Sequence, residues 1–272
     1  MPAPQASLLA QLAKTQYISK AVKLPPDWDA GLEDEVNGKT PEFGPGLPKP
    51  TNLFIPPSTK KIAVDAANAI SDGFNEFIDD IAKAICAAWA NWHSTVKFVG
   101  VIINGPIGIL PPAGMIGGGM MATPMILSQF NQKSANYTLY GSAVAFAIGQ
   151  AWTAWELGYT NLSIPFPAGA VASTTMPPSP SVPIPIASGM SPGDALMDAS
   201  MLKTLMSSQV APPGPHDDEL FDSIAQAFNQ VFTIWKGTAM ISNIMGAGGV
   251  APPPPAPPGP VAGAIGNGGA VQ

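Results

Sequence analysis

Residues 81–92 read IAKAICAAWANW, residues 144–155 read VAFAIGQAWTAW, and residues 224–235 read IAQAFNQVFTIW. All three follow one pattern of twelve positions. It begins with an aliphatic residue, Ala-x-Ala and an apolar residue. After three variable positions comes an aromatic residue (Trp or Phe), and after two more comes a final Trp. On an α-helix the first, fifth, ninth and twelfth positions fall on one narrow stripe, because successive residues turn by about 100°. The repeat therefore predicts three amphipathic helices, each closing a small core with an aromatic pair at its C-terminal end.

These aromatic pairs are candidate core anchors, because large rings beside alanines fill the gap between closely packed helices. The final tryptophans of the three copies are 63 and 80 residues apart, which is too irregular for a solenoid with a fixed period of roughly 20–50 residues. Two arrangements stay open: an internal pseudo-threefold cluster, or one bundle whose helices share ancestry. The predicted core anchors are Trp89, Trp92, Trp152, Trp155, Phe232 and Trp235.

Stretches rich in Pro and Gly follow the helices, at residues 105–127, 163–193 and 246–272. Such composition is typical of extended chain. We therefore predict a mainly α fold, with three related Trp-anchored helical modules joined by long Pro/Gly-rich extended arms. The expected organisation is an N-terminal helix and irregular arm (1–59), a helical core (60–245) with modules at about 60–127, 139–190 and 217–245, and a C-terminal tail (246–272).

Charged residues are scarce. They make up 11% of the chain, less than half of the usual share of about a quarter, and a free monomer normally covers itself with mixed charges. This composition predicts that other subunits cover much of the surface. All 12 basic residues are lysines and the net charge is −6. Without arginines or a basic stripe, the chain is not expected to bind nucleic acid.

No set of residues with catalytic or metal-binding spacing is evident. The two histidines, His93 and His216, are far apart in the sequence, and His216 precedes three acidic residues that are typical of a helix N-terminus. Cys86, the one cysteine, lies inside an apolar helical run, where a buried thiol is the expected state. We therefore expect no enzyme, no cofactor and no metal site.

Between Phe98 and Gly193 only Lys133 and Glu156 carry charge. Prolines and glycines interrupt this segment, so it contains no run of about 20 apolar residues that could span a membrane as a helix. Burial against other subunits is favoured over membrane contact, and the flexible methionines of the segment suit such an interface. The interface candidates are Met115, Met120, Met121, Met125, Ile164 and Phe166.

Taken together, the Ala-rich helices with Trp anchors, the Pro/Gly-rich arms and the low charge resemble structural components of tailed-phage particles and of phage-derived contractile injection systems. The resemblance implies a collar, baseplate, tail or capsid-associated subunit that assembles with itself and with other subunits. The alternative is a membrane-active or secreted effector that uses residues 98–193. The N-terminus lacks the basic and apolar regions of a signal peptide, so we expect cytoplasmic synthesis and a final place in a virion or extracellular particle.

Overall fold

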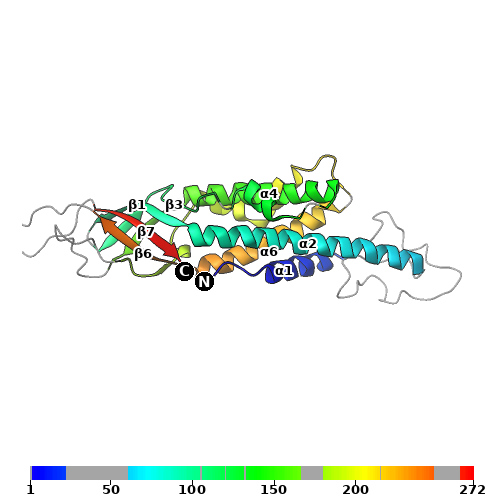
Figure 1. Cartoon of the computed structure of the whole chain (residues 1–272), viewed down its shortest axis with the longest axis horizontal. Helices are drawn as coiled ribbons and strands as arrows, with labels where there is room; N and C mark the ends of the chain where they lie inside the picture. The colour runs from blue at the N-terminus through cyan, green and yellow to red at the C-terminus, as the bar shows by residue number, and fades with distance from the viewer. Residues whose placement is uncertain are drawn as a thin grey trace, which may run out of the picture.

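The computed structural model describes residues 2–22, 61–104, 106–119, 121–131, 133–166, 180–214, 216–247 and 264–272. These residues form an elongated molecule, with helices along most of its length and an antiparallel sheet at one end (Figure 1). The long helices are α2 (Lys61–Thr95), α4 (Ala135–Gly158) and α6 (Asp217–Thr238). All three run in the same direction, so that their C-terminal ends meet the sheet (Figure 1).

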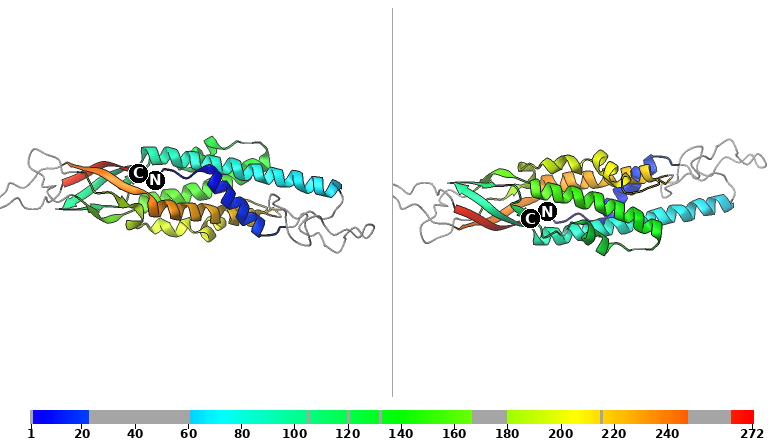
Figure 2. Two further views of the ribbon diagram at one scale, coloured as in Figure 1. Left: turned by 90° about the horizontal axis from the view of Figure 1, so that it is seen from below. Right: turned by 90° about the horizontal axis from the view of Figure 1, so that it is seen from above.

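The remaining helices pack around these three. The N-terminal helix α1 (Ala6–Ser19) lies against α2 and α6, and it crosses the bundle obliquely (Figure 2). Helix α3 (Thr123–Gln129) contacts α2 and α4, and α5 (Ala199–Ser207) contacts α4 and α6. Helix α4 is therefore covered on several sides, and most of its residues from Gly141 to Trp155 are buried. This enclosure explains much of the low charge of the middle of the chain.

The sheet has seven strands in the order β4-β2-β1-β7-β6-β5, with the short β3 paired to β1. The two ends of this order, β4 and β5, approach each other. The N–H of Val182, two residues before β5, donates a hydrogen bond of 2.9 Å to the carbonyl of Pro165 in β4. The sheet thus curls almost into a barrel. The strands are β1 (Lys97–Asn104), β2 (Ile107–Leu110), β3 (Met115–Ile116), β4 (Asn161–Pro165), β5 (Ile184–Pro185), β6 (Met240–Ala247) and β7 (Ala264–Val271).

The prediction of a mainly α fold with three helical modules is wrong, because a large antiparallel sheet of seven strands, curled almost into a barrel, accompanies the helices. Each long helix ends three residues after its final Trp, at Thr95, Gly158 and Thr238, and a strand begins within the next three residues. The apolar, β-branched run after Thr95 suits a strand that buries one face. The predicted modules at about 60–127 and 217–245 therefore contain strands after their helices, at Lys97–Asn104 and from Met240 onward.

The expected arms also differ from the prediction. Residues 105–127 contribute β2, β3 and the start of α3 instead of an extended connector, and residues 264–271 of the expected tail form a central strand. Glycine makes this packing possible, because a Cβ at Gly108 would lie 2.7 Å from the ring of Phe166. Residues 167–179 and 248–263 of the arms, and 23–60 of the N-terminal arm, lie outside the described residues.

The N-terminal helix forms at Ala6–Ser19, within the segment 1–59 where one was expected, and α2 passes through Gly73 without interruption. Helix α2 has 35 residues, which corresponds to a length of about 50 Å. Its C-terminal end at the sheet is where the aromatic side chains gather.

Candidate functional site

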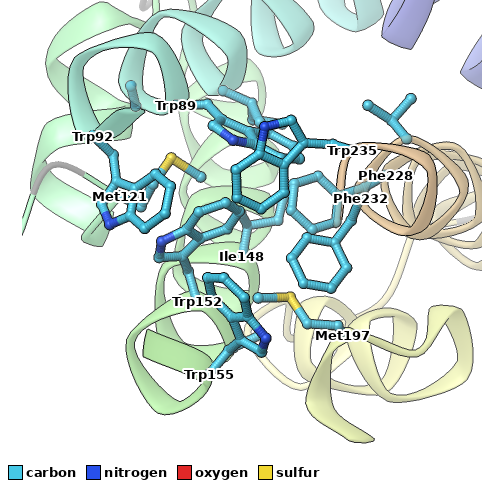
Figure 3. Close-up of a cluster of buried hydrophobic side chains, with 14 of the residues drawn as sticks. Trp89, Trp92, Met121, Ile148, Trp152, Trp155, Met197, Phe228, Phe232 and Trp235 are labelled. Carbon is cyan, nitrogen blue, oxygen red and sulfur yellow. The ribbon is translucent and has the colours of Figure 1, made fainter. Parts of the chain in front are cut away.

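The rings of the three repeats form one aromatic cluster between the helices (Figure 3). The ring centroids of Trp89 and Trp152 are 4.8 Å apart, those of Trp92 and Trp152 are 4.9 Å apart, and those of Trp89 and Trp235 are 5.1 Å apart. Three separate small cores were expected, but these contacts join all three helices in a single core. The six predicted anchors are between 0% and 3% exposed.

Most of the tryptophan contacts are edge-to-face. Among the described residues, no hydrogen-bond acceptor is found for the buried indole N–H groups of four of the rings, namely those of Trp89, Trp152, Trp155 and Trp235. Edge-to-face packing places neighbouring π faces close to these donors, and a π face is a weak hydrogen-bond acceptor.

Trp92 differs from the other rings, because its Nε1–H donates to a carboxylate oxygen of Glu156 at 2.9 Å. The second oxygen of Glu156 accepts a hydrogen bond from the Gly117 N–H. Burial raises the pKa of Glu156, and the two N–H donors act in the opposite direction. Glu156 is 9% exposed, so this carboxylate is a buried link between the last turns of two helices and the segment after β3.

The packing around Trp92 also requires glycine at position 117. A Cβ at this position would lie 1.9 Å from Nε1 of Trp92, so any larger residue would displace the indole. This link was not predicted, because in the sequence Glu156 stood out only as a lone charge in an apolar segment. Its position next to Trp155 in a helix without other charges was the available signal.

The interface candidates of the uncharged segment are mostly core residues. Met115, Met121, Ile164 and Phe166 are between 0% and 4% exposed, because strands β3 and β4 and the chain before α3 direct them inward. These four residues fill the interior of this chain and are not on its surface. Met125 is 37% exposed, and Met120 lies outside the described residues.

Other aliphatic residues do form a surface, which we call the outer aliphatic face. Ile102 of β1 pairs in register with Ile109 of β2 on one side and with Ile265 of β7 on the other. Ile102 and Ile265 are 45% and 51% exposed, and Ile109 is half-buried. Ile107, 45% exposed, and Leu162 of the adjoining β4, 62% exposed, extend the face.

The strands beneath this face carry large aliphatic residues on both sides. In β1, exposed Ile102 stands between buried Val101 and Ile103. A continuous aliphatic run of this kind is typical of a strand that is covered on both sides of its sheet. Among the described residues, the helices adjoin one end of the sheet and none lies over the outer aliphatic face (Figure 2). The arrangement can therefore bind another apolar surface.

The described residues contain no group of three or more His, Cys, Asp or Glu side chains that could hold a metal ion. Burial raises the pKa of the Cys86 thiol to about 12, which leaves it protonated and unreactive at neutral pH. Within the same described ranges, no helix has the length and apolar character needed to cross a bilayer. Comparison of the chain with protein-family models, with curated proteins and with solved structures finds no match.

Proposed function

We propose that this chain is a structural subunit of a larger protein particle, in which further subunits cover the outer aliphatic face of the sheet. The main observation in support of this proposal is the row of Ile109, Ile102 and Ile265 across three neighbouring strands. Contiguous exposed apolar surface is uncommon on proteins that act alone, and it is characteristic of interaction sites. A face of this kind supports assembly, because covering it removes apolar area from water.

The partner that fits this face best is a second copy of the chain. The residues of the face are all uncharged, so two copies can meet without burying an unpaired charge. Isologous contact of identical apolar rows is the usual way in which a symmetric oligomer forms. The resemblance in composition to subunits of phage and phage-derived contractile particles supports the same role.

The oligomeric state in solution tests the proposal. We expect light scattering of the purified chain to give a mass that is a multiple of 27.9 kDa and that falls on dilution. Replacing both Ile102 and Ile265 by Lys should yield a folded monomer, because the added charges would have to be buried on association. Leu139→Lys is the matched control, since Leu139 is a comparably exposed aliphatic residue, at 41%, on α4.

Three outcomes would count against the proposal. The first is a wild-type chain that stays monomeric at high concentration. The second is an oligomer that the Ile102→Lys and Ile265→Lys pair leaves intact. The third is co-sedimentation with vesicles of neutral phospholipid that the same pair abolishes, because this result would assign the face to a membrane surface.

A further inference from the structure

A hollow of 440 Å³ opens at the other end of the bundle, between the first half of α2, the start of α4 and the start of α6. Four aromatic side chains line it, together with a carboxylate. They are Phe74, Phe77, Tyr137, Tyr140 and Asp217. Its volume is within the range of about 300–1,000 Å³ that is usual for small-molecule sites. The hollow is distinct from the outer aliphatic face, which lies on the sheet.

The aromatic residues of the hollow hold one another in position. The ring of Phe77 meets that of Tyr137 edge-to-face at a centroid distance of 5.2 Å, and it meets that of Tyr140 in the same way at 6.4 Å. The Tyr137 hydroxyl donates to Asp80 at 2.8 Å. These contacts fix the walls before any ligand arrives, which lowers the entropic cost of binding.

Asp217 gives the hollow its charge. This residue is 7% exposed, and its carboxylate accepts hydrogen bonds from the Gly214 N–H and from the Tyr140 hydroxyl. Both partners are neutral, and the described part of the chain gives Asp217 no ion pair. The neighbouring His216 supplies little positive charge, because burial lowers the pKa of its imidazole. The wall of the hollow therefore carries a nearly buried carboxyl group that pairs with none of the described lysines.

The opposite rim shows how a cation is held on this part of the molecule. Lys133 pairs with Glu76 and with Asp80, and its Nζ lies 5.3 Å from the centroid of the Tyr137 ring. This lysine thus pairs with two of the acidic residues of α2. Asp217 lies on α6 and is not one of its partners. A cationic ligand in the hollow would give Asp217 an ion-pair partner.

We infer that this hollow binds a small organic ammonium ion with an apolar body. The aromatic walls, Phe74 included, would contact the apolar body of the ligand. Asp217 would offset the charge of its ammonium group. An ammonium group near aromatic rings also gains from their quadrupoles, which makes such sites selective for cations over neutral molecules of the same shape. This inference is independent of the proposed assembly role.

Binding of phenyltrimethylammonium, followed by ligand-observed NMR, tests the inference. Its neutral isostere tert-butylbenzene has the same shape, so any difference between the two probes reports the charge. We expect the ammonium ion to bind at least about tenfold more tightly than the isostere. We expect Asp217→Asn to weaken binding of the ammonium ion by about tenfold and to leave the affinity for the isostere unchanged.

Asp218→Asn is the matched control, because Asp218 occupies the next position of the same helix and its side chain is 73% exposed. It should bind both probes as the wild type does. Phe74→Leu provides a second variant that keeps the carboxylate and should weaken both probes together. Equal affinity for the two probes would overturn the inference, as would an Asp217→Asn variant that is folded by near-ultraviolet circular dichroism and binds the ammonium undiminished.

Discussion

The Trp92 indole and the Glu156 carboxylate are joined by a hydrogen bond of 2.9 Å in the interior of the protein. This bond connects the last turn of α2 to the last turn of α4, and the second oxygen of Glu156 continues the connection to Gly117. The helical bundle and the segment that follows β3 are thus tied together by one side chain. Buried polar links of this kind hold their partners in a single arrangement when every donor is matched by an acceptor.

The first prediction concerns this link. In Glu156→Gln the amide group must turn its NH₂ toward either Trp92 or Gly117, so one buried N–H loses its acceptor. Leaving a buried donor unsatisfied costs about 1–3 kcal/mol. We expect urea unfolding at neutral pH to show a loss of this size. Lys83→Gln, a change at an exposed position of α2, should leave the free energy of unfolding nearly unchanged. Equal stabilities of Glu156→Gln and the wild type would contradict the role of the link.

A second prediction follows from the titration of Glu156. Burial raises its pKa in the folded chain, so the folded form holds the proton more tightly than the unfolded form does. The stabilisation from this proton is complete below the unfolded pKa, about 4, and is lost as the pH rises through the folded pKa. We expect the difference in unfolding free energy between the wild type and Glu156→Gln to widen as the pH is lowered from neutral toward about 4. If this difference in unfolding free energy narrows instead, the pKa of Glu156 is lowered in the folded chain and the prediction is wrong.

The third prediction concerns the single aromatic core. Because Trp89 and Trp152 are in contact at 4.8 Å, replacing each by Phe should not give additive losses of stability. A double-mutant cycle should yield a coupling of about 0.5–3 kcal/mol. A matched cycle between Trp89→Phe and Phe166→Leu, a core residue beyond β4, should be additive within about 0.5 kcal/mol. Additivity in both cycles would instead indicate separate cores.

The fourth prediction compares two glycines. At Gly117 an added Cβ would meet the Trp92 indole, whereas at Gly73, inside α2, it would meet nothing within 4 Å. Gly117→Ala should therefore destabilise the chain by about 1–3 kcal/mol through overpacking. Gly73→Ala should stabilise it by about 0.5–1 kcal/mol, because alanine favours the helix. Thermal unfolding of both variants would show shifts in opposite directions, and a shared direction would be inconsistent with the packing at Trp92.

Much of the helical part of this fold could be read from the sequence, because the spacing of Ala and aromatic residues follows the helical period over whole turns. The strands could not be predicted from the sequence in the same way. The run from Lys97 to Asn104 follows α2 with a single residue between them, and a short apolar run without a turn signal fits either structure. Strand β7 contains three glycines, which are unfavourable in strands, so its composition indicated an arm.

The candidate site was harder to predict for a different reason. The outer aliphatic face unites Ile102 and Ile265, which are 163 residues apart in the sequence, and only the pairing of β1 with β7 brings them together. Interior methionines such as Met115 and surface isoleucines such as Ile102 have the same apolar character in a linear reading. Their opposite locations depend on strand register, which changes the exposed side with a shift of one residue.

The place of β7 in the sheet also sets an order of events during synthesis. This strand, Ala264–Val271, lies between β1 and β6, so the ribosome must make it before β1 acquires its neighbour on that side. Contacts of such long sequence separation form slowly, and unpaired strand edges expose the nascent chain to aggregation in the meantime. The helices can form as they emerge, whereas the row that joins Ile102 to Ile265 is completed only when β7 docks beside β1.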